Sequence, residues 1–216
     1  MSNVVRVAVG LGAISGVAGG GLLLNKFLST EDIQSKLKAN SLEILDSNNN
    51  DDIWKKILAS YKEVSAKEPK FKFSGEEVSD ETKLKKQCED TLKKKAGEDN
   101  ESNNYYDKAK RWCTVPTSVE KVLGKERIIL STDTTPTKDK ENQAEWDEKI
   151  KKYTDQTNKD KIDNLDLGSK AITDVKPENR TRIREACKKL NEKHSFEEGY
   201  EEAIKKSQTW CSIEKK

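Results

Sequence analysis

Apolar side chains return every three or four residues in several stretches of this chain, as they do along the buried face of an amphipathic helix. Charged and polar residues fill the positions between them. After its N-terminal segment, the chain is therefore predicted to be mainly α. The expected helices lie around Ile33 and Leu37, over residues 53–64, 84–92 and 105–113, and later over residues 146–153, 177–190 and 200–211.

Local signals mark the starts of three of these helices. Asp51 or Asp52 follows a polar loop and is expected to cap the first long helix, because a carboxylate can accept hydrogen bonds from the free N–H groups there. Ser79 and Asp80 lead into the next helix in the same way. Pro177 is expected in the first turn of a later helix, where its missing N–H has no cost.

The tryptophans and cysteines indicate that the chain contains two similar halves. All four Trp and all four Cys fall at matching places. The matches are Trp54, Leu58 and Tyr61 with Trp146, Ile150 and Tyr153; Leu84 and Cys88 with Ile183 and Cys187; and the dipeptide Trp112-Cys113 with Trp210-Cys211. Because both residue types are rare, this agreement predicts a diverged, duplicated module of three helices, covering residues 29–130 and 143–216.

Between the halves, residues 131–142 are polar, contain Pro136 and have no apolar periodicity. Such a composition is typical of a linker. Just before it, residues 127–130 read Arg-Ile-Ile-Leu and fit either a short strand or a buried turn.

The cysteines lie about 25 residues apart in both halves, a spacing that suits one bridge per half. The repeat selects Cys88–Cys113 and Cys187–Cys211 from the possible pairings. The alternatives are buried free thiols and a zinc site, although no Cys-x2-Cys spacing occurs and His194 is the only histidine. Disulfides persist outside the reducing cytosol, so the bridges predict an extracellular domain or an equivalent oxidising side.

The N-terminal segment is apolar from Val4 to Leu24, with Arg6 as its only charge. At about 1.5 Å per helical residue, it nearly spans a hydrocarbon core of roughly 30 Å. Residues 1–28 are therefore predicted to form a transmembrane anchor or uncleaved signal segment. A cleaved signal peptide ending near Ala18 is the alternative. A dinucleotide-binding turn at Gly10-x-Gly12 is disfavoured, because no strand–helix alternation follows.

Small residues recur every fourth position in this segment, at Ala8, Gly12, Gly16 and Gly20. On a helix they form one stripe, which allows two membrane helices to pack backbone to backbone. Self-association through this stripe is a hypothesis; a glycine-rich anchor without a partner is the alternative. The charges flanking the segment are nearly balanced, so they do not fix its orientation.

Composition narrows the choice of partners. Charged residues make up 37% of the chain and apolar residues 32%, yet the net charge is only +2. Nucleic-acid binders usually gather a basic excess on one face, whereas here acidic and basic residues alternate throughout. We therefore expect no nucleic acid as partner. With so few apolar residues the core is expected to be thin.

No residue pattern predicts catalysis, a cofactor or a metal. The P-loop, zinc-protease and serine-hydrolase motifs do not occur, and the many carboxylates make any one pair uninformative. His194 is expected at a solvated helix end, and Trp54 and Trp146 in the core rather than as recognition anchors. The sequence Asn179-Arg-Thr181 matches a glycosylation acceptor.

Over nearly its whole length the chain resembles the large paralogous families of short hypothetical proteins of haemotropic mycoplasmas. The resemblance is carried by the glycine-rich start running into residues 22–29, by the Trp-Lys-Lys-Ile helix at Trp54, and by the two Trp-Cys endings. It implies a membrane or surface location in a wall-less bacterium, with roles in host contact or antigenic variation. No lipobox cysteine follows the apolar segment, so a lipoprotein anchor is not supported.

Two functions follow as expectations. The first is a membrane-anchored, surface-exposed protein without catalysis, which binds a host or surface protein or serves as an antigenic module. The second is a membrane-anchored scaffold on the cytoplasmic side, with reduced cysteines. A carboxylate enzyme with its cleft between the halves is a third idea that no motif supports.

Overall fold

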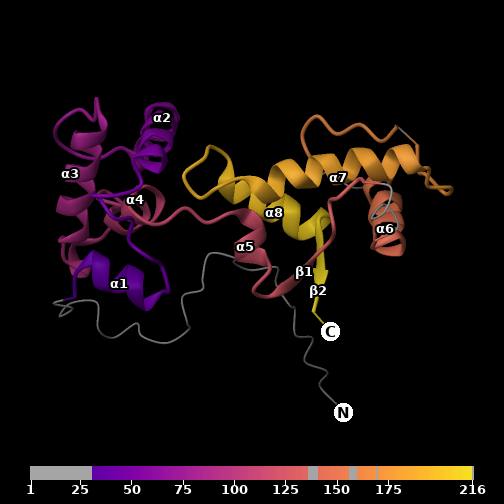
Figure 1. Cartoon of the computed structure of the whole chain (residues 1–216), viewed down its shortest axis with the longest axis horizontal. Coiled ribbons are helices and arrows are strands. Elements are labelled where there is room, and N and C mark those ends of the chain that lie inside the picture. The colour runs from indigo at the N-terminus through magenta and orange to yellow at the C-terminus, as the bar shows by residue number, and fades with distance from the viewer. Residues whose placement is uncertain (1–30, 136–140, 156–159, 169, 216) are drawn as a thin grey trace, which may run out of the picture.

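The structure, a computed structural model of the chain, describes residues 31–135, 141–155, 160–168 and 170–215. The predicted mainly helical fold is confirmed for these residues, which form eight α-helices and one pair of short strands (Figure 1). The helices are α1 (Ile33–Ala39), α2 (Asp51–Lys67), α3 (Glu81–Leu92), α4 (Tyr105–Trp112), α5 (Val119–Leu123), α6 (Gln143–Thr154), α7 (Pro177–Glu192) and α8 (Tyr200–Trp210). Two 3-10 turns, Pro69–Phe71 and Ala96–Glu98, and the strands β1 (Arg127–Ile129) and β2 (Ser212–Glu214) complete the elements.

Helices α2, α4, α6 and α8 all begin after a residue in the left-handed conformation. These residues are Asn50, Asn104, Asn142 and Gly199, with φ between 49° and 70°. Asn and Gly tolerate this conformation better than other residues. The expectation that Asp51 or Asp52 caps α2 was wrong, because Asn50 occupies the cap and both aspartates lie in the first turn. There their charges still favour the helix dipole.

The first half packs α1 to α4 around one apolar cluster. Trp54, Tyr61, Leu84 and Trp112 lie at its centre and are at most 4% exposed. Phe71, Phe73 and Val78 close the cluster from the segment between α2 and α3. The helices owe this arrangement to their amphipathic faces, since burying large apolar side chains is the main favourable contribution to folding.

The second half packs α6, α7 and α8 around a second apolar cluster. Trp146, Ile150, Ile183 and Trp210 are fully buried in it. Leu130, directly after β1, belongs to the same cluster. Residues 127–130, for which strand and turn were both open, begin with a strand: β1 pairs antiparallel with β2, with Ile128 opposite Ile213.

The indole and phenol groups make matching hydrogen bonds in the two halves. The Nε1 of Trp54 donates to the carbonyl of Asp46 at 2.9 Å, and that of Trp146 to the carbonyl of Ser131 at 3.1 Å. The hydroxyl group of Tyr61 accepts the backbone N–H of Phe73 at 3.1 Å, and that of Tyr153 accepts the N–H of Ile162 at the same distance. Trp112 and Trp210 donate to the carbonyls of Phe71 and Asp160.

The likeness extends to a short helix that the repeat pattern did not include. The N–H of Ile33 at the start of α1 donates to the carbonyl of Lys94, and that of Val119 at the start of α5 donates to Lys193. Both bonds join the short helix to the loop between the two cysteine-bearing helices of a half. α1 packs on α3 and α4, and α5 packs on α7 and α8. Thus α5 and β1, which the repeat pattern assigned to residues 29–130, contact elements of the second half.

The segment expected to be a linker makes specific contacts with the second half. The backbone N–H of Ser131 donates to the side chain of Asn142 at 3.0 Å. The guanidinium of Arg184, which is fully buried, donates to the carbonyls of Asp133 and Glu141. These bonds hold both described ends of the segment against α6 and α7.

Candidate functional site

Each half contains one disulfide at the place that the repeat predicted. Cys88 of α3 is bonded to Cys113 directly after α4, and Cys187 of α7 to Cys211 directly after α8. The predicted pairing is therefore confirmed, and no described cysteine is a free thiol or part of a zinc site. All four cysteines are at most 3% exposed. Each bridge closes a loop that contains the connection between the two helices.

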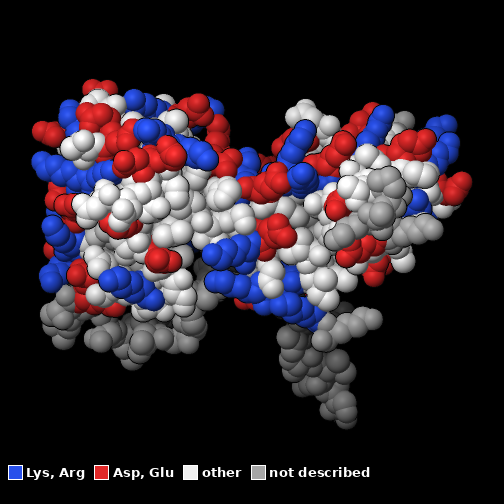
Figure 2. Space-filling model, in the orientation of Figure 1, with Lys and Arg blue, Asp and Glu red and all other residues white. Residues whose placement is uncertain are grey.

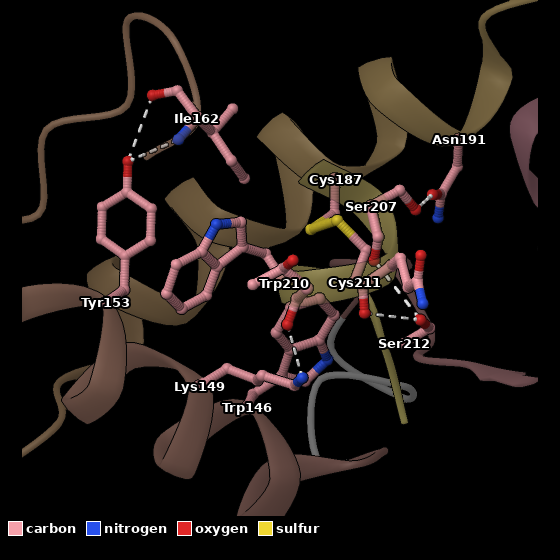
Figure 3. Close-up of a disulfide and its surroundings, with 12 residues drawn as sticks. Trp146, Lys149, Tyr153, Ile162, Cys187, Asn191, Ser207, Trp210, Cys211 and Ser212 are labelled. Carbon is pink, nitrogen blue, oxygen red and sulfur yellow. Dashed lines mark hydrogen bonds between the residues drawn. A yellow bond between two sulfur atoms is a disulfide. The ribbon is translucent and has the colours of Figure 1, made fainter. Parts of the chain in front are cut away.

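The second disulfide is enclosed by aromatic and polar side chains (Figure 3). Trp210 lies between Tyr153 and the disulfide, and its ring meets that of Tyr153 edge-on at a centroid distance of 4.9 Å. On the other side of the bridge the hydroxyl of Ser207 donates to Asn191. Because Ser207 and Asn191 are almost fully buried and bonded to each other, this polar pair carries little unsatisfied hydrogen-bonding capacity.

A pocket of about 300 Å³ adjoins the first disulfide. It opens between α1, the 44–47 segment and α3, and its polar lining includes Gln34, Asp46, Lys85 and Glu89. The ammonium of Lys85 lies 5.8 Å from the centre of the Trp54 ring and 3.1 Å from Asp51. With an aromatic floor and charges of both signs at its edge, the pocket can accept an amphipathic side chain of a partner. It contains no thiol, histidine or serine–histidine pair.

Lysines at equivalent positions of α4 and α8 have different surroundings. The ammonium of Lys206 lies 2.7 Å from Asp163 and 2.8 Å from Glu202. Lys108 is 4% exposed, and burial lowers its pKa. Its half has Ser74 and Asn104 where the other has the two carboxylates, and no described carboxylate forms a salt bridge with it. The two halves therefore share their helical arrangement, but the charged contacts at equivalent positions differ.

The two halves meet at a buried arginine. The Arg111 side chain is 2% exposed, and its guanidinium lies 4.3 Å from the centre of the Phe71 ring. It donates to the carbonyl of Glu197 at 2.7 Å and faces the carboxylate of Glu201 at 3.3 Å. Arg111 thus joins α4 of the first half to the start of α8 in the second.

The loop between α7 and α8 provides the rest of this junction. Phe196 packs into the apolar cluster of the first half, and its carbonyl accepts a hydrogen bond from Ser60 at 2.6 Å. Lys67 at the end of α2 pairs with Glu198 at 2.6 Å. The junction therefore combines an apolar insertion with ionic and backbone contacts, which fixes one orientation of the halves.

Replacing Arg111 by methionine is expected to lower the free energy of unfolding by about 2 kcal/mol, because methionine keeps the apolar stem but leaves the Glu197 carbonyl without its charged donor. We also expect faster proteolysis between residues 114 and 118. Urea unfolding and limited proteolysis would measure both effects. Lys110→Met on the exposed face of α4 is the matched control. Equal behaviour of the two variants would contradict the junction's role.

The other described residues that were singled out from the sequence take part in packing and local hydrogen bonds. Trp54 and Trp146 are in the core, as predicted. His194 follows the end of α7, as predicted, and stacks on Phe196 with its side chain 44% exposed. Asn179 lies in the first turn of α7, where its side chain accepts the N–H of Lys176. The stripe of Gly12, Gly16 and Gly20 lies outside the described residues. Sequence reasoning missed Arg111, which looks like any surface arginine on a helix.

The chain matches no protein-family model, no curated protein and no solved structure. Across the described ranges, no group of three His, Cys, Asp or Glu side chains is placed to bind a metal ion. Nor does any helix within them have the length and apolar character needed to cross a bilayer. The predicted anchor at residues 4–24 lies outside those ranges.

Proposed function

We propose that this chain is a membrane-anchored protein whose helical part lies outside the cell and binds another protein without catalysis. The observation that carries the proposal is the pair of buried disulfides at equivalent places in the two halves. Disulfides form and persist in oxidising surroundings and are rare in the cytosol. A chain that relies on two of them for a thin core is suited to the exterior.

The anchor itself is proposed from the sequence. Residues 4–24 are apolar and, as a helix, nearly long enough to cross a bilayer. Helix α1 begins at Ile33, a few residues after the predicted segment, so the helical part would follow the membrane directly. The small-residue stripe of the segment supports self-association of two anchors as a secondary proposal.

A binding role is supported by the kind of surface that the fold presents. The aromatic residues are mostly buried in the two cores and the junction, and the charged exterior includes a pocket beside Trp54. The resemblance to the paralogous proteins of haemotropic mycoplasmas points to a host or surface protein as the partner, or to an antigenic role.

One preparation tests three points: the side of the membrane on which the helical part lies, the pairing of the cysteines, and the membrane anchor. Intact cells that express the full chain are first treated with a membrane-impermeant maleimide, then with trypsin, and the fragments are identified by mass spectrometry. We expect tryptic loss of the helical part without lysis, and recovery of Cys88–Cys113 and Cys187–Cys211 as bridged peptides. Pelleting with the membrane in alkaline carbonate would report the anchor.

Other outcomes would replace this proposal. A helical part that is protected until lysis, with all four cysteines recovered as thiols, would establish the cytoplasmic scaffold instead. A chain that stays in the supernatant with its first residues intact would remove the anchor. A cytosolic protein with known topology serves as the control for lysis.

A further inference from the structure

Several elements with basic residues lie along one side of the molecule. Figure 1 shows α1, α5 and the β1–β2 pair at the lower side, whereas α2 and α7 lie at the upper side. In Figure 2 Lys and Arg side chains gather over α5 and the start of the strand pair, while both signs mix along the upper edge. We call the exposed residues Lys93, Lys94, Lys95, Lys121, Lys125, Ile128 and Lys215, which lie in or beside these elements, the basic face.

In the first half the basic face adjoins the point where the chain leaves the predicted anchor. Lys93, Lys94 and Lys95 are consecutive and exposed. The carbonyl of Lys94 accepts the N–H of Ile33, and Ala96 donates to the carbonyl of Glu31. From the end of the anchor at residue 28 to Glu31 the chain can extend at most about 10 Å. The three lysines are therefore held close to the membrane surface.

In the second half α5 takes the place that α1 has in the first, so it carries the basic face onward. Lys121 and Lys125 are exposed, and the ammonium of Lys215 is bonded to the carbonyls of Gly124 and Lys125 at 3.0 and 2.8 Å. These contacts bring lysines from two distant parts of the chain to one turn. The like charges of Lys152 and Arg127 add to burial in lowering the pKa of nearby Lys149.

Strand β1 carries an exposed apolar side chain. Ile128 of β1 is 44% exposed and is the one large apolar residue of the described ranges that is classed as exposed. It follows Arg127 in β1 and lies three residues after Lys125. An exposed apolar residue near lysines in the sequence suits the boundary between lipid headgroups and acyl chains.

Acidic residues lie on the same elements, and some of them interact within the protein. Asp32 caps α1 by accepting the N–H of Ser35. Glu214 lies 3.9 Å from Arg127 across the strand pair. Glu120 and Glu126 also lie on this side and reduce its charge without cancelling the lysines.

We propose that the basic face rests on the anionic headgroups of the membrane that holds the anchor, with Ile128 at headgroup level. This inference rests on the proposed membrane anchorage, but it holds on either side of the membrane. Lysines near an anionic surface gain favourable electrostatic energy that adds up over several residues. The anchor would bring the face within the distance over which such attraction acts, because the Debye length is about 8 Å at physiological salt.

The test measures the reactivity of each lysine in the full chain, reconstituted in nanodiscs of phosphatidylcholine alone or with added phosphatidylserine. A water-soluble acylating reagent labels the ammonium groups, and mass spectrometry gives a rate for each. We expect Lys93, Lys121 and Lys125 to react roughly fivefold more slowly in the anionic discs. Exposed Lys62 of α2 and Lys188 of α7 serve as controls and are expected to react at one rate in both.

A charge-reversal variant makes the result specific. Lys121→Glu with Lys125→Glu is expected to abolish the protection of Lys93 as well, whereas Lys62→Glu with Lys188→Glu keeps it. Equal rates in both disc types, in chains that co-purify with the discs, would overturn the lipid contact and leave the anchor intact. Chains that fail to enter discs would overturn both proposals. Protection that follows an added protein instead of the lipid would assign the face to a protein partner.

Discussion

Replacing Trp210 by alanine is expected to lower the free energy of unfolding by about 4 kcal/mol, as for other large aromatic side chains in a core. Trp210 is fully buried, its ring packs edge-on against Tyr153, and its Nε1 donates to the carbonyl of Asp160 at 2.6 Å. The substitution opens a cavity beside the Cys187–Cys211 bridge and leaves a carbonyl without its donor. Urea unfolding followed by circular dichroism would measure the loss.

Two variants would separate packing from the hydrogen bond. Trp210→Phe keeps an aromatic ring against Tyr153 but removes the donor, so a smaller loss of about 2 kcal/mol is expected. Thr209→Ala, at the neighbouring position of α8, should change stability little. A loss below about 1 kcal/mol for Trp210→Ala would show that the second core does not depend on this ring.

Removing the bridge between Cys187 and Cys211 by changing both residues to alanine is expected to cost about 3 kcal/mol. The bond closes a loop of 24 residues, so its loss enlarges the set of unfolded conformations that must be given up on folding. The expected readout is a lower urea midpoint for the variant. Reduction of the wild-type protein with dithiothreitol breaks both bridges and should produce a larger shift than the loss of this bridge alone.

The corresponding pair Cys88→Ala and Cys113→Ala provides the matched test, because its loop of 25 residues is nearly the same length. The two variants should lose similar stability. A much smaller loss at Cys88–Cys113 would mean that strain or residual structure, and not loop closure, determines the contribution. No change in either variant would remove the physical argument for two bridges in a chain with a thin core.

Several core residues could be predicted from the sequence, because Trp and Cys are rare and the apolar positions recur periodically. Trp54 and Trp146 were predicted to lie in the cores, and the cysteine spacing predicted both bridges. Trp112 and Trp210, which marked the repeat, are buried as well. Helices with a regular apolar face were predicted for the same reason. The periodicity depends on local spacing, so it works wherever an element is long enough to repeat.

Short and irregular elements could not be predicted from the sequence. Helix α5 has five residues, too few for a period. Its likeness to α1, with Val119 and Leu123 buried as Ile33 and Leu37 are, becomes clear only from the packing and the matching backbone hydrogen bonds. The segment between α6 and α7 buries Ile162, Leu167 and Val175 without regular structure. The sequence of strand β2 has no pattern that predicts a strand. The strand forms by pairing with β1, which lies far away in the sequence.

The candidate surfaces depended still more on tertiary structure. Arg111 and Arg184 sit on helices among many charged residues, and only the packed structure shows that both are buried. The basic face joins lysines from three separate segments, while the chain as a whole has a net charge of only +2. The net charge of the chain does not reveal this cluster of lysines, because the cluster depends on where the lysines lie in the folded structure.

The residues that join the two halves are not repeated at the corresponding positions of the other half. The inserted Phe196 corresponds to Gly97 in the first half, by their places after Ser195 and Ala96, and Arg111 corresponds to Thr209 in the second. In a solenoid each unit offers its neighbour the same contact, so the array can grow. Here the corresponding positions hold Gly97 and Thr209, so the contact that joins the two halves is made once among the described residues.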